Sequence, residues 1–360
     1  QKIISNKQIN ALKNYSLKFN NWLKKTGEPP ALLKKTDIEV SKKRIIKYYK
    51  NLGYYDVTVG IDSQRIKENK IILKYKIIPN QKYLIDSITA EIESQELKTL
   101  YNGNIKDQII IKGEPFEINK FEQERERLFL LFKNNGIYNF QQNSIQFTAA
   151  IDSSGNDINI PVKIKIENIK KRVNDSLKKI PYKKYKIKEV LVFVDDLKNE
   201  SAKYYDSIYY NDFKIYSKGK LKFRPKAITS GINVKKEKFY SDEDRNLTFR
   251  YFNNLKNFKY PSINYELSPD KESLIASIYL NPKERFSLGF DLDLSHSNIQ
   301  DFGFGVGGGL GIRNVFSGAE ILELNLKNTL GASRDIAQSD DQFFNLFELG
   351  ADLKLSVPRL

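Results

Sequence analysis

Residues 286–357 alternate apolar and polar side chains, and this pattern constrains the fold more than any other feature of the chain. From Phe286 to Ser295 every second residue is apolar, and the residues between them are small or acidic. The same alternation recurs in 322–327 and 347–357. Because successive side chains of a strand point to opposite faces, each stretch predicts a strand with one apolar and one polar face. Such strands are typical of a transmembrane β-barrel, apolar toward lipid and polar toward the lumen.

The composition is that of a folded protein with several modules. The 360 residues are 40% hydrophobic and 29% charged, which argues against a disordered chain. No apolar run approaches the roughly 20 residues that a transmembrane helix needs. Any contact with a membrane is therefore expected through barrel strands or at the surface.

The net charge and the cysteine content narrow the range of binding partners and of reactive sites. The formal net charge of +16 favours anionic lipid, acidic protein or nucleic acid as partner. Lys residues are spread along the chain and no nucleic-acid-binding motif accompanies them, so we expect no nucleic-acid binding. The chain has no Cys, which excludes disulfides and thiolate sites within it. It starts at Gln1 and contains no Met, which we interpret as an internal or processed start.

The residues before 286 predict a repeat in which helices precede a pair of strands. The third copy also carries a polar, Tyr-rich insertion, 195–222. The first copy lacks an opening strand and shows instead a helical pattern from Asn10 to Phe19. The expected helices are Val40–Leu52 in the first copy, Ser94–Tyr101 and Asn119–Asn135 in the second, and Ser241–Leu255 in the third. The expected strands are Tyr54–Val59 and Lys70–Ile78 in the first copy, Tyr83–Ile92, Ile145–Ala150 and Ile158–Ile166 in the second, and Tyr185–Val194, Phe258–Leu267 and Ser273–Leu280 in the third.

Short motifs at the helix-to-strand junctions resemble a known module. The run Asn51-Leu52-Gly53-Tyr54-Tyr55-Asp56-Val57 is similar to the turn of POTRA (polypeptide-transport-associated) domains, and 135–140 is a looser version. Tandem POTRA units leading into barrel strands resemble the BamA/TamA family of outer-membrane assembly factors. The segment Asn20–Pro30 resembles more specifically TamL, the lipoprotein-type relative of TamA, and Gly307–Glu320 resembles the second strand and turn of the family's barrel.

This resemblance implies the fold class. We expect α+β tandem POTRA domains (β-α-α-β-β) followed by the first antiparallel strands of a transmembrane β-barrel. The expected domains are 1–80, which lacks its first strand, then 81–170 and 182–282, and the barrel strands of 283–360. The family's barrel has about sixteen strands, so the barrel is incomplete in this chain. The lipid-attachment Cys of a TamL-type lipoprotein is not in this sequence.

The resemblance also implies the function. The protein would lie in the bacterial outer membrane, with its POTRA domains in the periplasm, and assist assembly or translocation of outer-membrane proteins. Its partners would be nascent outer-membrane proteins, the lipid bilayer, and a TamB-like periplasm-spanning protein or other assembly-complex subunits. No cofactor or metal is expected.

The sequence predicts no enzyme. The single His, His296, follows the first barrel strand and is interpreted as a polar strand-end residue. Asp291 and Asp293 share one strand face, a spacing that fits a polar lumen better than an acid–base pair. The glycines of 303–311 are followed by no Gly-Lys-Ser/Thr motif, which argues against a phosphate-binding loop.

The candidate functional residues are strand edges. A small open sheet leaves backbone N–H and C=O groups unpaired, and an extended segment can bind there as an additional strand. Alternatively, these edges only contact a neighbouring module. By resemblance, the first barrel strand, 285–297, forms a lateral seam. The candidate residues are Ile145, Gln146, Phe147 and Thr148 in the second unit, Asn264, Tyr265, Glu266 and Leu267 in the third, and Phe286, Leu288, Phe290, Leu292 and Leu294 at the seam.

Two other functions stay open at this point. A two-partner secretion pore, which exports a cognate protein, also joins POTRA domains to a barrel. A patatin-like esterase fused to a barrel would need a Gly-x-Ser-x-Gly turn, which does not occur in this chain. The sequence also leaves open whether the protein is of the TamL or the BamA type.

Overall fold

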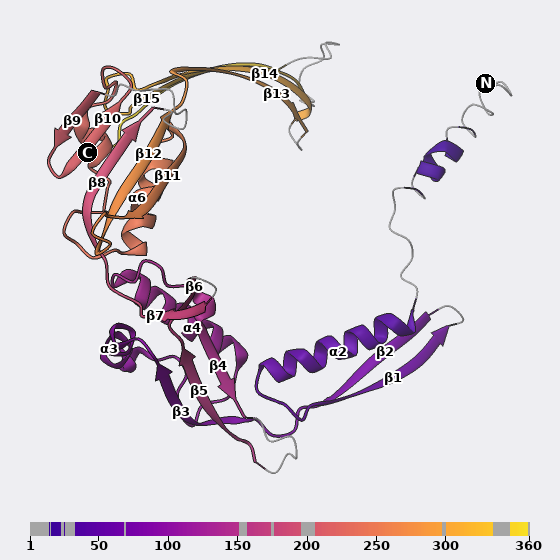
Figure 1. The fold of residues 1–360 in the computed structure, drawn as a ribbon. Helices are drawn as coiled ribbons and strands as arrows, with labels where there is room; N and C mark the ends of the chain where they lie inside the picture. The colour runs from indigo at the N-terminus through magenta and orange to yellow at the C-terminus, as the bar shows by residue number, and fades with distance from the viewer. Residues whose placement is uncertain are drawn as a thin grey trace, which may run out of the picture. The chain divides into compact units, whose positions relative to one another are not determined.

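The structure is a computed structural model of mixed α/β class whose sheets are not closed into a barrel (Figure 1). Two compact units divide the chain. The first consists of the described residues up to Ile88, together with those of 111–121 and 149–162; the second holds the rest. The described residues are 14, 16–22, 25, 33–67, 70–150, 157–173, 176–195, 206–296, 300–333 and 346–358.

The N-terminal part of the first unit is a helix with a two-stranded antiparallel sheet. Helix α2 (Lys35–Asn51) is followed by β1 (Thr58–Lys67) and β2 (Lys70–Ile78). The helix ends at a turn through Gly53, whose φ of 93° is readily adopted only by glycine. The helix and the second strand predicted here are confirmed.

The strand predicted to begin at Tyr54 begins instead at Thr58, because residues 54–57 form a turn before β1. Side-chain contacts fix this turn. The Tyr83 hydroxyl donates to the Asp56 carboxylate at 2.9 Å, and the Tyr55 ring lies 5.9 Å from that of Phe116. Such tertiary contacts override the high strand propensity of consecutive aromatic residues.

The next elements form a three-stranded sheet with two longer helices. The order of the strands is β3-β5-β4, which leaves β4 at an edge. The elements are β3 (Leu84–Ile92), α3 (Gln95–Gly103), η1 (Ile105–Asp107), α4 (Ile118–Asn134), η2 (Gln142–Ser144), β4 (Ile145–Ala149) and β5 (Asn159–Ile166). The predicted strands and helices of this region are confirmed. The residues Ser153-Ser154-Gly155-Asn156, whose sequence is typical of a turn, lie outside the described residues.

Helix α4 buries one charged residue, and the structure compensates it. Glu124 is fully buried, and its carboxylate receives two hydrogen bonds from the Arg127 guanidinium, at 2.7 and 2.8 Å. The backbone N–H of Ile109 donates a third, at 2.9 Å. This bonding satisfies the carboxylate inside the protein, where an unpaired charge would be strongly destabilising.

A basic hairpin follows, between the predicted strands 158–166 and 185–194. Strands β6 (Ile169–Val173) and β7 (Ser176–Ile180) pair antiparallel as a separate two-stranded sheet. Glu93 of β3 accepts hydrogen bonds from the Lys179 ammonium at 2.5 Å and from the Asn168 N–H at 2.8 Å. Lys-rich strands of this length carry a weak sequence signal, because Lys is depleted in strands.

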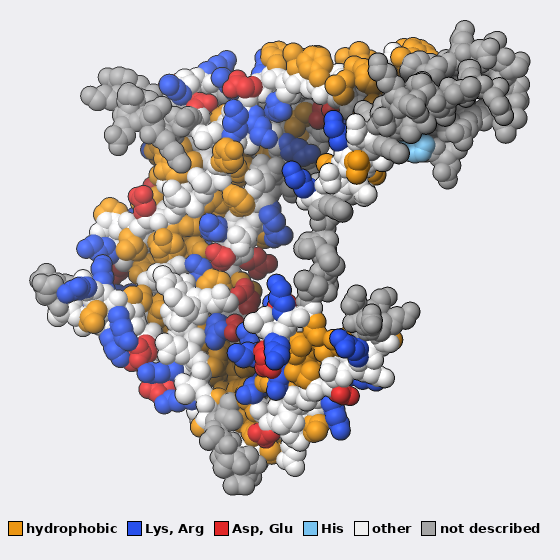
Figure 2. All heavy atoms as spheres, turned by 90° about the vertical axis from the view of Figure 1, so that its right-hand side faces the viewer, with side chains coloured by type: hydrophobic (Ala, Val, Ile, Leu, Met, Phe, Trp, Pro, Cys, Tyr) orange, Lys and Arg blue, Asp and Glu red, His pale blue; other side chains and the backbone are white. Residues whose placement is uncertain are grey.

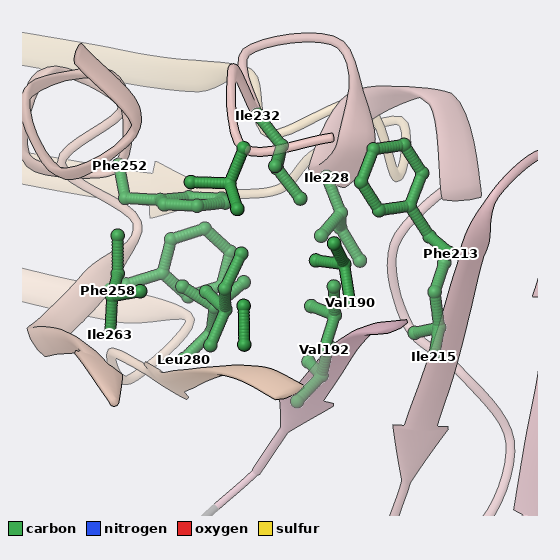
Figure 3. Close-up of a cluster of buried hydrophobic side chains, with 14 of the residues drawn as sticks. Val190, Val192, Phe213, Ile215, Ile228, Ile232, Phe252, Phe258, Ile263 and Leu280 are labelled. Carbon is green, nitrogen blue, oxygen red and sulfur yellow. The ribbon is translucent and has the colours of Figure 1, made fainter. Parts of the chain in front are cut away.

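The third region is built on a five-stranded mixed sheet. Its order is β11-β12-β8-β10-β9, with β12, β8 and β10 parallel to one another and the outer strands antiparallel. The elements are β8 (Lys186–Val194), β9 (Asp206–Tyr210), β10 (Phe213–Ser217), α5 (Pro225–Thr229), α6 (Asp242–Asn254), β11 (Phe258–Leu267) and β12 (Ser273–Pro282). Figure 3 shows the core between this sheet and its helices, where Val192, Phe252 and Leu280 are fully buried.

Helix α6 begins at an N-cap, Ser241. The hydroxyl of Ser241 accepts a hydrogen bond from the N–H of Asp244 at 3.2 Å. Three acidic residues follow in the first turn, where the helix dipole favours negative charge.

The Tyr-rich insertion of 195–222, for which the sequence analysis named no strand, contains two strands among its described residues. Strands β9 and β10 both fall in this segment and extend the sheet beyond β8. In β10, Phe213, Ile215 and Ser217 are buried, while the residues between them are partly exposed. This period-two pattern is present in the sequence, but the surrounding polar and Tyr-rich residues obscure it.

The last region is a four-stranded antiparallel sheet in the order β13-β14-β15-β16. Its strands are β13 (Phe286–Ser295), β14 (Gln300–Arg313), β15 (Ile321–Ser333) and β16 (Leu346–Ser356). The sheet confirms the strands predicted from the alternation. Among the described residues, no helix is both long enough and apolar enough to cross a bilayer.

Two predictions fall largely outside the described part of the chain. Residues 14 and 16–19 of the helix expected over 10–19 are helical. Most of the segment Asn20–Pro30, which carries the resemblance to TamL, lies outside the described residues.

Gly231 is expected to be intolerant of a methyl group. A Cβ atom there would overlap the ring of Tyr251, whose hydroxyl donates to the Ala227 carbonyl at 2.9 Å. Gly231→Ala should therefore lower the free energy of unfolding by about 1–3 kcal/mol, as overpacking does. Urea unfolding followed by circular dichroism measures the change. Gly103→Ala is the control, since nothing lies within 4 Å of its Cβ position; an equal loss in both variants would contradict the packing argument.

Candidate functional site: strand edges

Strand β13 is a long and regular edge. Its ten residues pair with β14 without a bulge, and the sheet order places no described strand on its other side. Alternate residues of such an edge leave N–H and C=O groups without a strand partner. The five predicted seam residues Phe286, Leu288, Phe290, Leu292 and Leu294 all lie on one face and are 60–85% exposed.

The register extends this apolar face across the sheet. Leu288 lies opposite Leu310, which lies opposite Leu324 and then Leu353. Figure 2 shows hydrophobic side chains gathered along the upper rim, where this sheet lies. An exposed apolar surface of this kind is unusual for a protein in water and marks an interaction with lipid or protein.

The opposite face is polar and carries a glycine stripe along β14. Gly303, Gly305, Gly307, Gly309 and Gly311 occupy this face in alternation. The Lys327 ammonium of β15 pairs with the Asp293 carboxylate of β13 at 2.5 Å. In the register, Lys327 lies opposite Gly307 and Asp293 lies opposite Gly305, so the ion pair crosses β14 above residues without side chains.

The edge of β11 is interrupted in its first half. Its register with β12 shifts between Lys259 and Ser262, and Tyr260 has a φ of 46°. Pro261 at this position has no N–H to donate to another strand. These features prevent regular strand addition at the start of β11, although the strand lies at the edge of the sheet.

A neighbouring region occupies the second half of the β11 edge. The Tyr138 hydroxyl, beyond α4, donates to the Tyr265 carbonyl at 3.1 Å. The rings of Tyr138, Tyr240 and Tyr265 pack together with centroid separations of 5.0–5.8 Å. At Tyr265, the contact with a neighbouring module that the sequence analysis left open is therefore present.

Lys133 ties this tyrosine cluster to α4. Its ammonium donates to the Tyr138 carbonyl at 2.8 Å and lies 4.9 Å from the centroid of the Tyr240 ring. Burial lowers the pKa of Lys133, an effect that Asp242 partly opposes. Burial also raises the pKa of the Tyr265 phenol, whose oxygen has no hydrogen-bond partner among the described residues. Tyr265 therefore serves as a packing group here, whereas Lys133 holds the cluster through its hydrogen bond and its contact with the Tyr240 ring.

The edge of β4 is short and partly covered. The Arg125 guanidinium of α4 donates to the Ile145 carbonyl at 3.3 Å and lies 5.3 Å from the Phe147 ring. Ile145 is buried, Phe147 is half-buried, and Gln146 and Thr148 are exposed. Of the three predicted edges, β13 is thus the longest regular one without a covering contact among the described residues.

The turn between β14 and β15 anchors the four-stranded sheet to the five-stranded one, a feature that the sequence analysis did not identify. Ala319 is 2% exposed and belongs to the core of the five-stranded sheet. Its carbonyl accepts a hydrogen bond from the Asn257 side chain at 2.7 Å. The Arg224 N–H donates to the Ser317 carbonyl at 2.7 Å, and the Asn314 amide donates to the Lys222 carbonyl at 2.9 Å.

Glu320 organises this turn from within. Its carboxylate is buried and accepts hydrogen bonds from the N–H groups of Phe316 at 3.1 Å and Gly318 at 2.9 Å. Buried turn N–H groups need such partners, because an unpaired one is destabilising. The only sequence signal was the acidic residue at the end of a Ser-Gly turn.

Comparisons with known proteins add weak structural similarities. No model of a protein family and no curated protein matches the chain. BamA from Haemophilus ducreyi lacking POTRA domains 1–3 has a TM-score of 0.42 at 9% identity, over 69% of this chain and 39% of that one. CdiB from Escherichia coli has a TM-score of 0.33 at 10% identity, over 92% of this chain and 49% of that one. POTRA domains 3–5 of Haemophilus influenzae BamA give 0.34 at 10% identity, over 68% of this chain and 80% of that one.

The structural neighbours thus include BamA and CdiB. This chain spans 39% of the length of the first of these structures. What this chain does therefore has to be argued from its own residues.

Removing the hydroxyl of Tyr138 should loosen the β11 contact. Tyr138→Phe deletes the donor to the Tyr265 carbonyl, and we expect a loss of about 1 kcal/mol in the free energy of unfolding. Hydrogen exchange measured at residues 263–267 should increase in parallel. The control is Tyr260→Phe, since Tyr260 is 91% exposed on the same strand. Unchanged exchange in Tyr138→Phe would show that this hydroxyl does not protect the edge.

Glu320→Ala should detach the β14–β15 turn from the core of the five-stranded sheet. The substitution leaves two turn N–H groups without their acceptor, and the buried one, that of Gly318, destabilises the turn by about 1–3 kcal/mol. Trypsin cleavage after Arg313, next to the turn, should accelerate in detergent micelles. Glu323→Ala removes the same charge from a half-exposed position of β15 and should leave cleavage unchanged. Equal acceleration in both variants would refute the assigned role of Glu320.

Proposed function

We propose that this protein assists the assembly of outer-membrane proteins and that β13 is the edge at which an incoming strand pairs. The observation that supports this most is the edge itself, which is ten residues long, unbroken by a bulge and bordered by an exposed apolar face. In hydrocarbon, unpaired backbone groups are strongly destabilising, so an edge of this kind favours binding of another strand. The incoming strand would be the substrate.

The arrangement of modules supports the same proposal. The chain combines small mixed α/β regions with an alternating antiparallel sheet, and its junction motifs resemble POTRA domains followed by barrel strands. We place the four-stranded sheet in the bacterial outer membrane and the preceding regions in the periplasm. We also propose that the protein is of the TamL type and that it binds a TamB-like partner in the periplasm.

The two other edges are assigned lesser roles. The β11 edge is interrupted at Pro261 and bonded at Tyr265, so we propose that it joins neighbouring regions of the protein. The β4 edge offers only five residues, of which Gln146 and Thr148 are exposed. It could hold a short extended segment through main-chain hydrogen bonds but provides few side-chain contacts.

A disulfide experiment tests the proposed role of β13. The chain contains no Cys, so Leu288→Cys introduces a single thiol at the edge. In cells we expect it to form disulfides with a Cys placed in the last strand of a nascent outer-membrane protein, because paired strands bring Cβ atoms to about 4.5–5.5 Å. Leu324→Cys is the control, since it lies on the same face of β15, which is paired on both sides.

The same experiment separates the proposed function from protein export. An exported polypeptide would pass the polar face, so capture by Ser287→Cys and Asp291→Cys but not by Leu288→Cys would indicate a secretion pore. That result, or equal capture at Leu288 and Leu324, would overturn the proposed strand pairing.

A further inference from the structure

A cavity of about 850 Å³ lies where the four-stranded sheet meets the five-stranded sheet. Its wall combines the segment before β13, the end of β14 and the loop after β10. The volume falls within the roughly 300–1,000 Å³ that is typical of ligand pockets. Neither the edges described above nor strand pairing makes use of this cavity.

The cavity is strongly cationic. Lys220, Lys222, Lys283, Arg285 and Arg313 contribute to its lining, against only two acidic residues, Asp195 and Glu284. The two acidic groups are engaged elsewhere: the Asp195 carboxylate accepts from the Lys218 N–H at 3.0 Å, and Glu284 lies 3.7 Å from Lys259. None of the five cations forms an ion pair with a carboxylate of the described residues.

The position of these cations relates them to the apolar face. Arg285 directly precedes β13, whose first residue Phe286 is 60% exposed, and Arg313 is the last residue of β14. Apolar side chains of Leu221, Pro282 and Val315 also line the cavity. Figure 2 shows Lys and Arg side chains below the hydrophobic rim. A band of positive charge at the end of an apolar surface matches the boundary between lipid tails and headgroups.

We propose that this cavity binds the phosphate of an anionic phospholipid headgroup. The inference rests on the membrane placement of β13–β16 proposed above. The ammonium and guanidinium groups would neutralise and hydrogen-bond the phosphate, while the lipid tails would follow the apolar face that starts at Phe286. The wall of Leu221, Pro282 and Val315 favours a lipid over a free phosphate ion, which would leave these apolar groups without a partner.

Competitive lipid retention tests the inference. The purified protein would be equilibrated in mixed micelles containing equal amounts of phosphatidylglycerol and phosphatidylcholine, and the lipids retained would be identified by native mass spectrometry. We expect preferential retention of phosphatidylglycerol. Lys222→Gln/Lys283→Gln should reduce that preference by about fivefold for each charge removed, since one surface cation contributes about 1 kcal/mol to anionic-lipid binding. The side chains of both residues make no hydrogen bond or ion pair with another described residue, so the variant should fold.

The control variant is Lys235→Gln/Lys236→Gln, which removes the same charge from exposed positions outside the cavity. Its preference should remain that of the unaltered protein. An equal loss in both variants would indicate diffuse attraction to the basic surface and overturn the assigned site. Displacement of phosphatidylglycerol by millimolar inorganic phosphate would indicate a free-anion site, which also overturns the lipid assignment.

Flotation with phosphatidylcholine vesicles separates this inference from the proposed function. A protein that floats with the vesicles but shows no phosphatidylglycerol preference would overturn the cavity inference alone. A protein that does not associate with vesicles at all would overturn the membrane placement as well.

Discussion

The buried carboxylate of Glu320 is the interaction on which the arrangement of the C-terminal half depends. It holds the N–H groups of Phe316 and Gly318, and this turn geometry inserts Ala319 into the core of the five-stranded sheet. The four-stranded sheet is therefore joined to the five-stranded sheet by a packed turn as well as by the covalent link between β12 and β13. As a result, strand β13 starts beside this packed turn, and residues of the turn also line the cationic cavity.

The exposed sheet edges are managed in different ways. At β11 a bulge with Pro261 interrupts the first half, and Tyr138 bonds the second. At β4 the edge is short and Arg125 covers its first carbonyl. Proteins in water commonly protect edges by such means, because an unprotected edge promotes aggregation. The absence of comparable protection at β13, among the described residues, supports the proposal that an incoming strand pairs there.

Sequence periodicity predicted many of the strands and helices but few of the contacts that hold them together. The strands of 286–356 and helix α6 could be predicted because their patterns are local: an alternation in one case and an N-cap with acidic residues in the other. Strands β9 and β10 were missed because polar neighbours dilute a five-residue pattern. The Tyr138–Tyr265 bond and the bond between Asn257 and Ala319 could not be predicted, since each joins residues that only the tertiary fold brings together.

The glycine stripe of β14 has a mechanical consequence. When a sheet curls, side chains on its concave face are brought together and resist further curvature. Five residues on the polar face of β14 have no side chain, so the sheet can bend toward that face with little steric resistance. The ion pair between Lys327 and Asp293 spans this crease and draws the two neighbouring strands toward each other. Strand β14 is thus the strand at which the sheet can bend most easily, and its glycine face sets the direction of the curvature.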